Sequence, residues 1–224
     1  AVSDTPCGMT PYEELAQRWP QVLQSALWRA GGFLALPGFP GAAALAAIRT
    51  EAADALRNSE RQEWPQPRPA DWRGGQPQRF LSGVTAGPCM NEMFARRETV
   101  AMLRGLLGVN LRCAGGGSLT VYERPGDRLG LHRDIETCDV TLVTCLWEEG
   151  ERREGVLRAY PEYAQCPLSS VPADRTVLGC TVPLRPGDSA VLLGGVVPHE
   201  VTPMALGQRR VVSLVCYRLL DSDG

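Results

Sequence analysis

Two histidines and an aspartate are the residues of this sequence whose types and spacing could bind a metal ion. His132 and Asp134 lie two positions apart in the segment GLHRDIE, and His199, the only other histidine, comes later in VVPHEVTP. Side chains two positions apart on a β-strand point to the same face, so the His132 imidazole and the Asp134 carboxylate could reach one point. Two histidines and one carboxylate leave three adjacent positions of an octahedral ion open. That arrangement suits a non-haem iron(II) that must also bind a cosubstrate and O2.

The His-x-Asp tripeptide does not establish a metal site by itself, because such a pair is more often a hydrogen-bonded couple at a strand edge. The residues after His199 favour the metal interpretation. Arg209 and Arg210 begin a segment rich in β-branched residues. The planar fork of an arginine there could hold a carboxylate through two hydrogen bonds.

The N-terminal part of the chain must support this site, and its patterns are mostly helical. Apolar residues at helical spacing predict a helix over 11–30 that is kinked or split at Pro20, and strong helix formers predict another over 41–60. A short strand is expected between them, at 32–39. We therefore expect two N-terminal helices with a strand between them.

A loop and a third helix complete the first half. Residues 64–80 contain four prolines and two glycines, so we expect a loop without regular structure. Residues 90–108 carry an apolar face at helical spacing and predict a helix that ends at Gly108.

The second half of the chain is β-like. Short segments rich in β-branched residues are bounded by glycine, proline or charged clusters and predict strands at 118–123, 139–147, 155–160, 176–184, 188–195 and 210–220. We therefore predict a mainly β fold with N-terminal helices, built around a mostly antiparallel barrel or two-sheet jelly roll. The chain is expected to form one domain over 1–224, with 1–110 as helical support and 111–224 as the jelly-roll core.

Composition narrows the function classes. The chain has 224 residues and a formal net charge of -2, which gives no electrostatic attraction to nucleic acid or to anionic membranes. The apolar stretches are interrupted by proline and glycine, and the N-terminus lacks the pattern of a signal peptide, so we expect a soluble cytoplasmic protein. The 8 cysteines form no C-x-x-C pair and favour buried free thiols over a disulfide or zinc framework.

Three segments together resemble the iron(II)- and 2-oxoglutarate-dependent dioxygenases, in particular their prolyl-4-hydroxylase-like branch. They are TVYERPGDRLGLHRD (120–134), REGVLRAYP (153–161) and LRPGDSAVLLGGVVPHEVTPMALGQRRVVSLVCYR (184–218). The resemblance covers about half of the chain and implies a double-stranded β-helix core, that is, a cupin-like jelly roll. It departs from the family where Glu154-Gly155-Val156-Leu157 replaces a Gly-Gly-Glu-Leu strand, which leaves the subfamily open.

The resemblance also implies roles for individual residues. His132, Asp134 and His199 would hold the iron. Arg209 falls where the family's basic residue binds the distal carboxylate of 2-oxoglutarate, and Ser213 shares its strand face, where the branch often has a hydroxyl group. Arg210 is the alternative if the register shifts by one residue. Tyr122, ten residues before His132, matches a tyrosine that hydrogen-bonds the same cosubstrate, although it could equally be an aromatic residue that fills the barrel.

The reaction implied is hydroxylation of an unactivated C–H bond with Fe(II), 2-oxoglutarate and O2, giving succinate and CO2. Desaturation, cyclisation or epimerisation at the same iron, and a peptidyl substrate, stay open. The charge and size favour a small molecule, such as an amino acid or a natural-product intermediate. Loop 64–80 is either a lid over the substrate or a surface loop pinned to the core by its tryptophans. As a lid, it could pack Trp64 and Trp72 on a ligand and bring Arg68, Arg73 or Arg79 to an acidic group.

Two other classes of protein could carry the same residues. A zinc hydrolase can use two histidines and a carboxylate, but it would leave Arg209, Ser213 and Tyr122 without a purpose. A non-catalytic jelly-roll binding module would need no complete ligand set. Oligomeric state is not indicated by any feature of the sequence.

Overall fold

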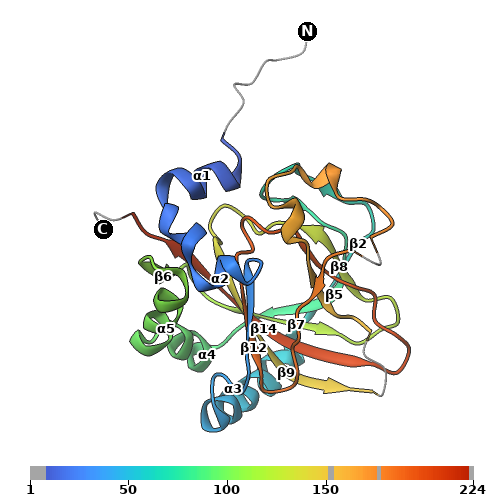
Figure 1. Cartoon of the computed structure of the whole chain (residues 1–224). Helices are drawn as coiled ribbons and strands as arrows, with labels where there is room; N and C mark the ends of the chain where they lie inside the picture. The colour runs from blue at the N-terminus through green and yellow to red at the C-terminus, as the bar shows by residue number, and fades with distance from the viewer. Residues whose placement is uncertain (1–8, 151–153, 176–177, 222–224) are drawn as a thin grey trace.

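The computed structural model describes residues 9–150, 154–175 and 178–221. Its α-helices gather on one side of the molecule (Figure 1). They are α1 (Pro11–Arg18), α2 (Ala26–Arg29), α3 (Ala42–Ala55), α4 (Pro88–Ala95) and α5 (Arg97–Leu107), with short 3-10 turns at η1 (Pro20–Gln24), η2 (Leu56–Asn58), η3 (Pro161–Tyr163) and η4 (Leu168–Ser170).

Local chemistry explains where several helices begin and end. Thr10 and Glu13 form a capping box at the start of α1. The helix ends before Trp19, and Pro20 begins η1, so the predicted split of 11–30 is confirmed. Gly108 ends α5 in the left-handed conformation, with φ 74°, as predicted. The single helix predicted over 90–108 is wrong, because Arg96 is extended (ψ 148°) and divides α4 from α5.

The strands form one curled antiparallel sheet in the order β1-β12-β9-β14-β7-β5-β8-β13-β10-β11, with β2 beside β5 and β6 beside β14. Because β5 pairs with both β7 and β8, it joins two layers that face each other as in a jelly roll. Strands β3 and β4 form a separate small ladder. The bounds are β1 (Phe33–Leu36), β2 (Glu60–Trp64), β3 (Arg68–Pro69), β4 (Gly75–Gln76), β5 (Arg79–Thr85), β6 (Leu111–Cys113), β7 (Ser118–Tyr122), β8 (Arg128–His132), β9 (Val140–Glu149), β10 (Leu157–Ala159), β11 (Cys180–Thr181), β12 (Ser189–Leu192), β13 (His199–Val201) and β14 (Arg209–Leu219).

Alternation along β14 divides the core into two parts. Val211 and Val215 pack with helix residues such as Phe94 and Leu103 in the larger apolar cluster. Val212 points the other way, into a smaller cluster inside the barrel with Tyr122, together with Leu81, Val143 and Met204. Even-numbered residues of this part of β14 therefore face the barrel interior, and odd-numbered residues face the helices.

Two expectations about regular structure need correction. Residues 64–80 are not wholly irregular, because β3 and β4 lie within them and β2 and β5 reach their two ends. The strand predicted at 176–184 is limited to β11, and its positions 176 and 177 lie outside the described residues. The predicted mainly β architecture with N-terminal helices is confirmed.

The expectation of free thiols is wrong for one pair of cysteines. Cys138 and Cys216 form a disulfide between the segment before β9 and the inward face of β14. Among the other cysteines that the structure describes, Cys145 is buried, Cys89, Cys113 and Cys166 are partly buried, and Cys180 is exposed; all five are free. Within the described part of the chain, no helix is long and apolar enough to cross a membrane.

Candidate metal centre

Strand pairing brings the three predicted ligands together. His132 ends β8 and His199 begins β13, and the two histidines are paired residues of this antiparallel ladder. The prediction that Asp134 lies on the same strand as His132 is wrong, because Asp134 lies just beyond the end of β8. There its backbone N–H donates to the Gly194 carbonyl at 2.8 Å. The irregular segment that follows β8 thus places the Asp134 carboxylate beside both rings.

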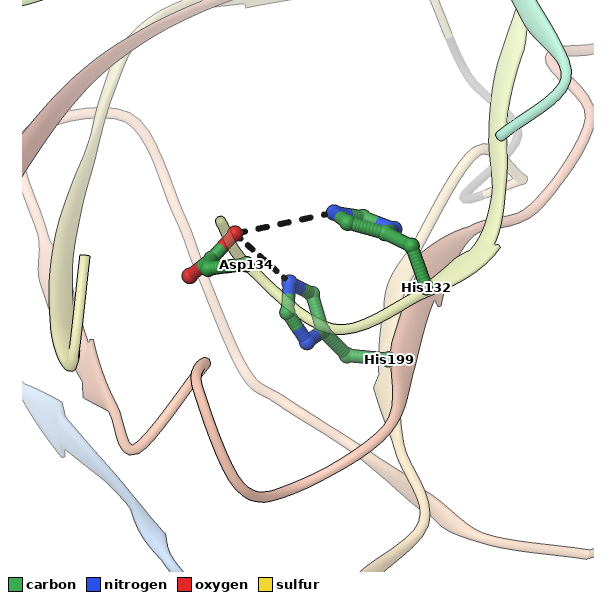
Figure 2. Close-up of side chains that lie close together, drawn as sticks. All are labelled: His132, Asp134 and His199. Carbon is green, nitrogen blue, oxygen red and sulfur yellow. Dashed lines mark ion pairs between the residues drawn. The ribbon is translucent and has the colours of Figure 1, made fainter. Parts of the chain in front are cut away.

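The donor atoms of these side chains converge (Figure 2). Asp134 Oδ1 lies 3.7 Å from His132 Nε2 and 3.6 Å from His199 Nε2. All three ligand atoms lie within 4.8 Å of one another. Donors about 2.1 Å from a shared ion and at right angles are about 3 Å apart, so small side-chain shifts would bring them to bonding distance.

The other nitrogen of each ring is fixed by a backbone carbonyl. His132 Nδ1 lies 2.8 Å from the Gly130 oxygen, and His199 Nδ1 lies 3.0 Å from the Val197 oxygen. A carbonyl can only accept, so each Nδ1 carries a proton and each Nε2 faces the site. Metal-binding histidines are commonly oriented in this way.

Burial and mutual charge set the protonation states. Burial, with the neighbouring His199, lowers the pKa of His132 to about 3. Burial alone would raise the pKa of Asp134, but the two histidines and the Thr141 hydroxyl hold it well below its usual range. Burial would lower the pKa of His199, but the Asp134 carboxylate raises it instead. Asp134 is thus ionised and His132 is neutral, whereas the second proton of a charged imidazole is favoured on His199. A metal ion bound at the site would replace this proton on His199.

The second oxygen of Asp134 is held by its surroundings. The Thr141 hydroxyl of β9 donates to Asp134 Oδ2. Gly194 leaves the space that this oxygen needs, since a Cβ added there would lie 1.9 Å from it. Thr141 and Gly194 were not predicted as site residues. A threonine in a β-branched strand carries no distinguishing signal, but the Gly194-Gly195 pair after an apolar strand was a usable one.

Arg73 fastens the segment that carries Asp134. Its guanidinium pairs with Asp139 at 2.7 Å and donates to the carbonyls of Ile135 at 2.5 Å and Cys138 at 2.7 Å. Loop 64–80 is therefore pinned beside the site, and the hydrogen bonds of Arg73 contribute to this. Trp72 of the same loop packs on the Arg133 guanidinium, 5.3 Å from the ring centroid.

The predicted cosubstrate residues separate into two groups. Tyr122 is 2% exposed and lies opposite Arg210 in the β7–β14 ladder, on the inward face. Arg209 lies at the surface beside Glu149 (3.3 Å) and Glu123 (3.7 Å). Ser213 is buried on the face directed at the helices, and its Oγ has no hydrogen-bond partner among the described residues. The alternation that places Arg209 and Ser213 on one face holds, but the structure does not bring that face to the metal centre.

A cleft of about 650 Å³ opens onto two of the three ligands, His132 and Asp134. His132 and Asp134 form part of its wall together with Arg79 of β5, Thr141 and the disulfide residues Cys138 and Cys216. Leu81, Leu129 and Leu214 give it an apolar side. Ligand pockets for small molecules commonly have about 300–1,000 Å³, so the cleft can enclose a compact molecule next to a metal ion.

Comparison with solved structures identifies proteins of the same architecture. The non-heme alpha ketoglutarate dependent epimerase SnoN from nogalamycin biosynthesis is 17% identical over 92% of this chain and 81% of its own, with a TM-score of 0.62. The carbocyclase SnoK from the same biosynthesis is 16% identical over 94% of this chain and 86% of its own, with a TM-score of 0.60. A Pseudomonas putida prolyl-4-hydroxylase is 18% identical over 91% and 98%, with a TM-score of 0.54.

No protein-family model and no curated protein sequence matches the chain. At this level of identity the structural likenesses establish the fold alone. That fold is the double-stranded β-helix of the 2-oxoglutarate- and iron(II)-dependent oxygenases, as the sequence resemblance implied. The His132, Asp134 and His199 cluster lies in this fold as a candidate metal centre.

Proposed function

We propose that this protein is an oxygenase that uses iron(II), 2-oxoglutarate and O2 to oxidise a C–H bond of a small molecule. The observation that carries the proposal is the convergence of two Nε2 atoms and one carboxylate oxygen beside a cleft, with each Nδ1 fixed by a carbonyl. Three protein donors would leave further positions on a bound iron for a cosubstrate and for O2. The proposal treats the chain as one domain, in which the N-terminal helices support the jelly roll.

The donor set fits iron(II). Two neutral imidazoles with a carboxylate suit a non-haem iron centre with open positions, and the pKa directions of His132 and Asp134 keep both in the metal-binding state at neutral pH. When bound, iron with 2-oxoglutarate and O2 supplies the oxidising power, and the cosubstrate leaves as succinate and CO2.

The inward face of β14 also fits a cosubstrate. The Nε atom of Arg210 is buried without a hydrogen-bond partner among the described residues, whereas its terminal nitrogens donate to Glu148 and to the Gly155 carbonyl. Burial raises the pKa of Tyr122, so its hydroxyl stays protonated and can donate. We therefore assign the distal carboxylate of 2-oxoglutarate to Arg210 and Tyr122, and not to Arg209 and Ser213, which face away.

The protein's own contribution is to orient and enclose. His132 and His199 are held in one tautomer, Thr141 fixes one oxygen of Asp134, and the apolar side of the cleft limits water around the ligand. The cleft volume favours a small molecule over a peptide. Hydroxylation is our first proposal; because structural neighbours include an epimerase and a carbocyclase, epimerisation and cyclisation at the same centre are alternatives, as is desaturation.

Succinate formation tests the proposal. The purified protein, reconstituted with iron(II) without oxygen, should convert 2-oxoglutarate to succinate when O2 is admitted, slowly alone and faster with a suitable substrate. His199→Ala should abolish this turnover and keep the fold, as checked by circular dichroism. If zinc supports turnover of a substrate and iron with 2-oxoglutarate gives no succinate, the chain is a zinc enzyme and the proposal fails.

A further inference from the structure

The buried and partly buried arginines of the barrel differ in which groups neutralise their charge. Three of them form ion pairs with carboxylates: Arg61 with Asp127, Arg73 with Asp139, and Arg210 with Glu148. Arg133 instead donates to backbone carbonyls, of which those of Val196 and Cys166 are each 2.7 Å away. Arg79 has no carboxylate partner within the described ranges. Its one side-chain hydrogen bond there is from Nη1 to Gln62 Oε1, at 3.1 Å.

Arg79 is nevertheless held in a defined position. Strands β2 and β5 pair Arg79 with Trp64, and the guanidinium carbon lies 4.8 Å from the centroid of the Trp64 ring. Its Nε atom is buried and has no hydrogen-bond partner among the residues that the structure describes. Burial lowers the pKa of Arg79, as expected for a cation that no nearby anion compensates.

The position of Arg79 points to a ligand. Arg79 lines the cleft together with His132 and Asp134, and it lies opposite Leu129 in the β5–β8 ladder, three residues before His132. An unneutralised, partly buried guanidinium is costly unless an anion pairs with it. A planar carboxylate matches the fork of Nε and a terminal nitrogen, since both can donate to its two oxygens.

We propose that Arg79 is a carboxylate-binding residue of this cleft, separate from the arginines of β14. The inference deepens the proposed function and rests on it. The carboxylate belongs either to the molecule that is oxidised or to the distal end of 2-oxoglutarate. In the second case Arg210 keeps its pair with Glu148, and Arg79 replaces Arg210 in the assignment made above. With the apolar side formed by Leu81, Leu129 and Leu214, the cleft then selects an acid with a small apolar body.

The first arm of the test measures 2-oxoglutarate. Anaerobic iron(II) protein is titrated with 2-oxoglutarate, and the visible charge-transfer absorption reports binding, for wild type, Arg79→Gln and Arg79→Lys. Loss of a charged hydrogen-bonded pair should weaken a ligand that uses Arg79 by about 10- to 100-fold, and lysine should restore only part of it. Such weakening in this arm assigns the carboxylate to 2-oxoglutarate.

The second arm measures simple acids. Acetate, hexanoate and phenylacetate are each compared with the matching amide, with and without saturating iron(II) and 2-oxoglutarate, by the change in tryptophan fluorescence, since Trp64 packs on Arg79. Wild type should bind the acids more tightly than the amides, and Arg79→Gln should remove that preference. This result, with 2-oxoglutarate affinity unchanged, assigns the carboxylate to the substrate.

Arg128→Gln is the matched control. Arg128 is the neighbouring arginine of the same ladder, with its guanidinium 4.5 Å from the Phe80 ring and bonded to Gln78, but it does not line the cleft. The Arg128→Gln variant should bind 2-oxoglutarate and the simple acids as wild type does. If Arg79→Gln is folded and also behaves as wild type in both arms, the inference is wrong; absence of the visible band in wild type contradicts the proposed function instead.

Discussion

At the scale of single residues, the two oxygens of Asp134 have separate tasks. Oδ1 faces both histidines, and Oδ2 accepts from Thr141 in space left free by Gly194. The carboxylate therefore cannot rotate without losing a contact. This pre-organisation explains how an aspartate that lies beyond its strand can still be a well-placed ligand.

Replacing Thr141 by valine should weaken iron without unfolding the protein. Thr141→Val removes the hydrogen bond to Asp134 at nearly constant volume, and loss of such a supporting contact commonly lowers metal affinity about 10- to 100-fold. Thr144→Val is the control, because Thr144 bonds Ser189 on the opposite face of β9. Competition of a chelator for iron(II) measures both variants, and equal affinities would contradict the role of Thr141.

At the scale of elements, the turn between β7 and β8 connects the strand that ends at Tyr122 to the strand that ends at His132. Asp127 closes this turn: its carboxylate accepts from both terminal nitrogens of Arg61, at 2.7 and 2.9 Å, and from the backbone N–H groups of Glu123 and Arg124. Burial would raise the pKa of Asp127, but these hydrogen bonds lower it below its usual value.

The stability given by Asp127 should depend on pH. Because its pKa is lower in the folded chain than the unfolded value of 3.8, its contribution is complete well above that pH and is lost as the pH falls toward the folded pKa. Asp127→Asn should lower the free energy of unfolding by about 1.5–3 kcal/mol at pH 7, and by less at pH 3. Urea unfolding measures this, with the exposed Asp54→Asn as a control that should change little. A constant difference between pH 7 and pH 3 would contradict the argument.

The Cys138–Cys216 disulfide ties the segment after Asp134 to β14. The two cysteines are 78 residues apart, so the bond restricts a long loop of the unfolded chain, and such bonds commonly add about 2–4 kcal/mol. Reduction by a phosphine should lower the unfolding midpoint of wild type and leave that of Cys138→Ser/Cys216→Ser unchanged. Cys180→Ser, at an exposed free thiol, should respond to reduction as wild type does. An unchanged wild-type midpoint would argue against the bond.

Sequence reasoning succeeded where a local pattern suffices. The split at Pro20, the end of α5 at Gly108 and most strands of the jelly roll follow from local residue patterns. The grouping of His132, Asp134 and His199 was predicted from their residue types together with the family resemblance. Alternation also predicts that Arg209 and Ser213 share a face. Which face points inward is decided by packing of β14 on the helices, so the choice between Arg209 and Arg210 needed the structure.

Other features depend on contacts between distant segments. The disulfide joins cysteines without a spacing motif, and β5 was hidden by the prolines and glycines before it. In loop 64–80 the sequence offers Arg68, Arg73 and Arg79 alike as partners of an acidic group, and the separate roles of Arg73 and Arg79 arise from partners elsewhere in the chain. No single segment could have revealed them.

At the scale of the whole molecule, the helices cover the outer face of the sheet layer that contains β14, and the cleft opens on the inner face of the same layer. A ligand that binds only the folded protein stabilises it by mass action, by about 2.7 kcal/mol at a concentration 100 times its dissociation constant. Iron(II) with 2-oxoglutarate should therefore raise the unfolding temperature of wild type in anaerobic calorimetry. His132→Ala should show no such increase, and an equal increase would place the metal elsewhere.

Anaerobic titration with iron(II), followed by 2-oxoglutarate, tests the central claim most directly. Wild type should bind about one iron per chain, the number expected for a single three-donor centre, and should develop a visible charge-transfer absorption when 2-oxoglutarate is added. Asp134→Ala should be folded and lose both signals. Iron bound with equal affinity by Asp134→Ala, or iron-loaded wild type without the visible absorption, would contradict the assignment of this centre as a 2-oxoglutarate-binding iron site.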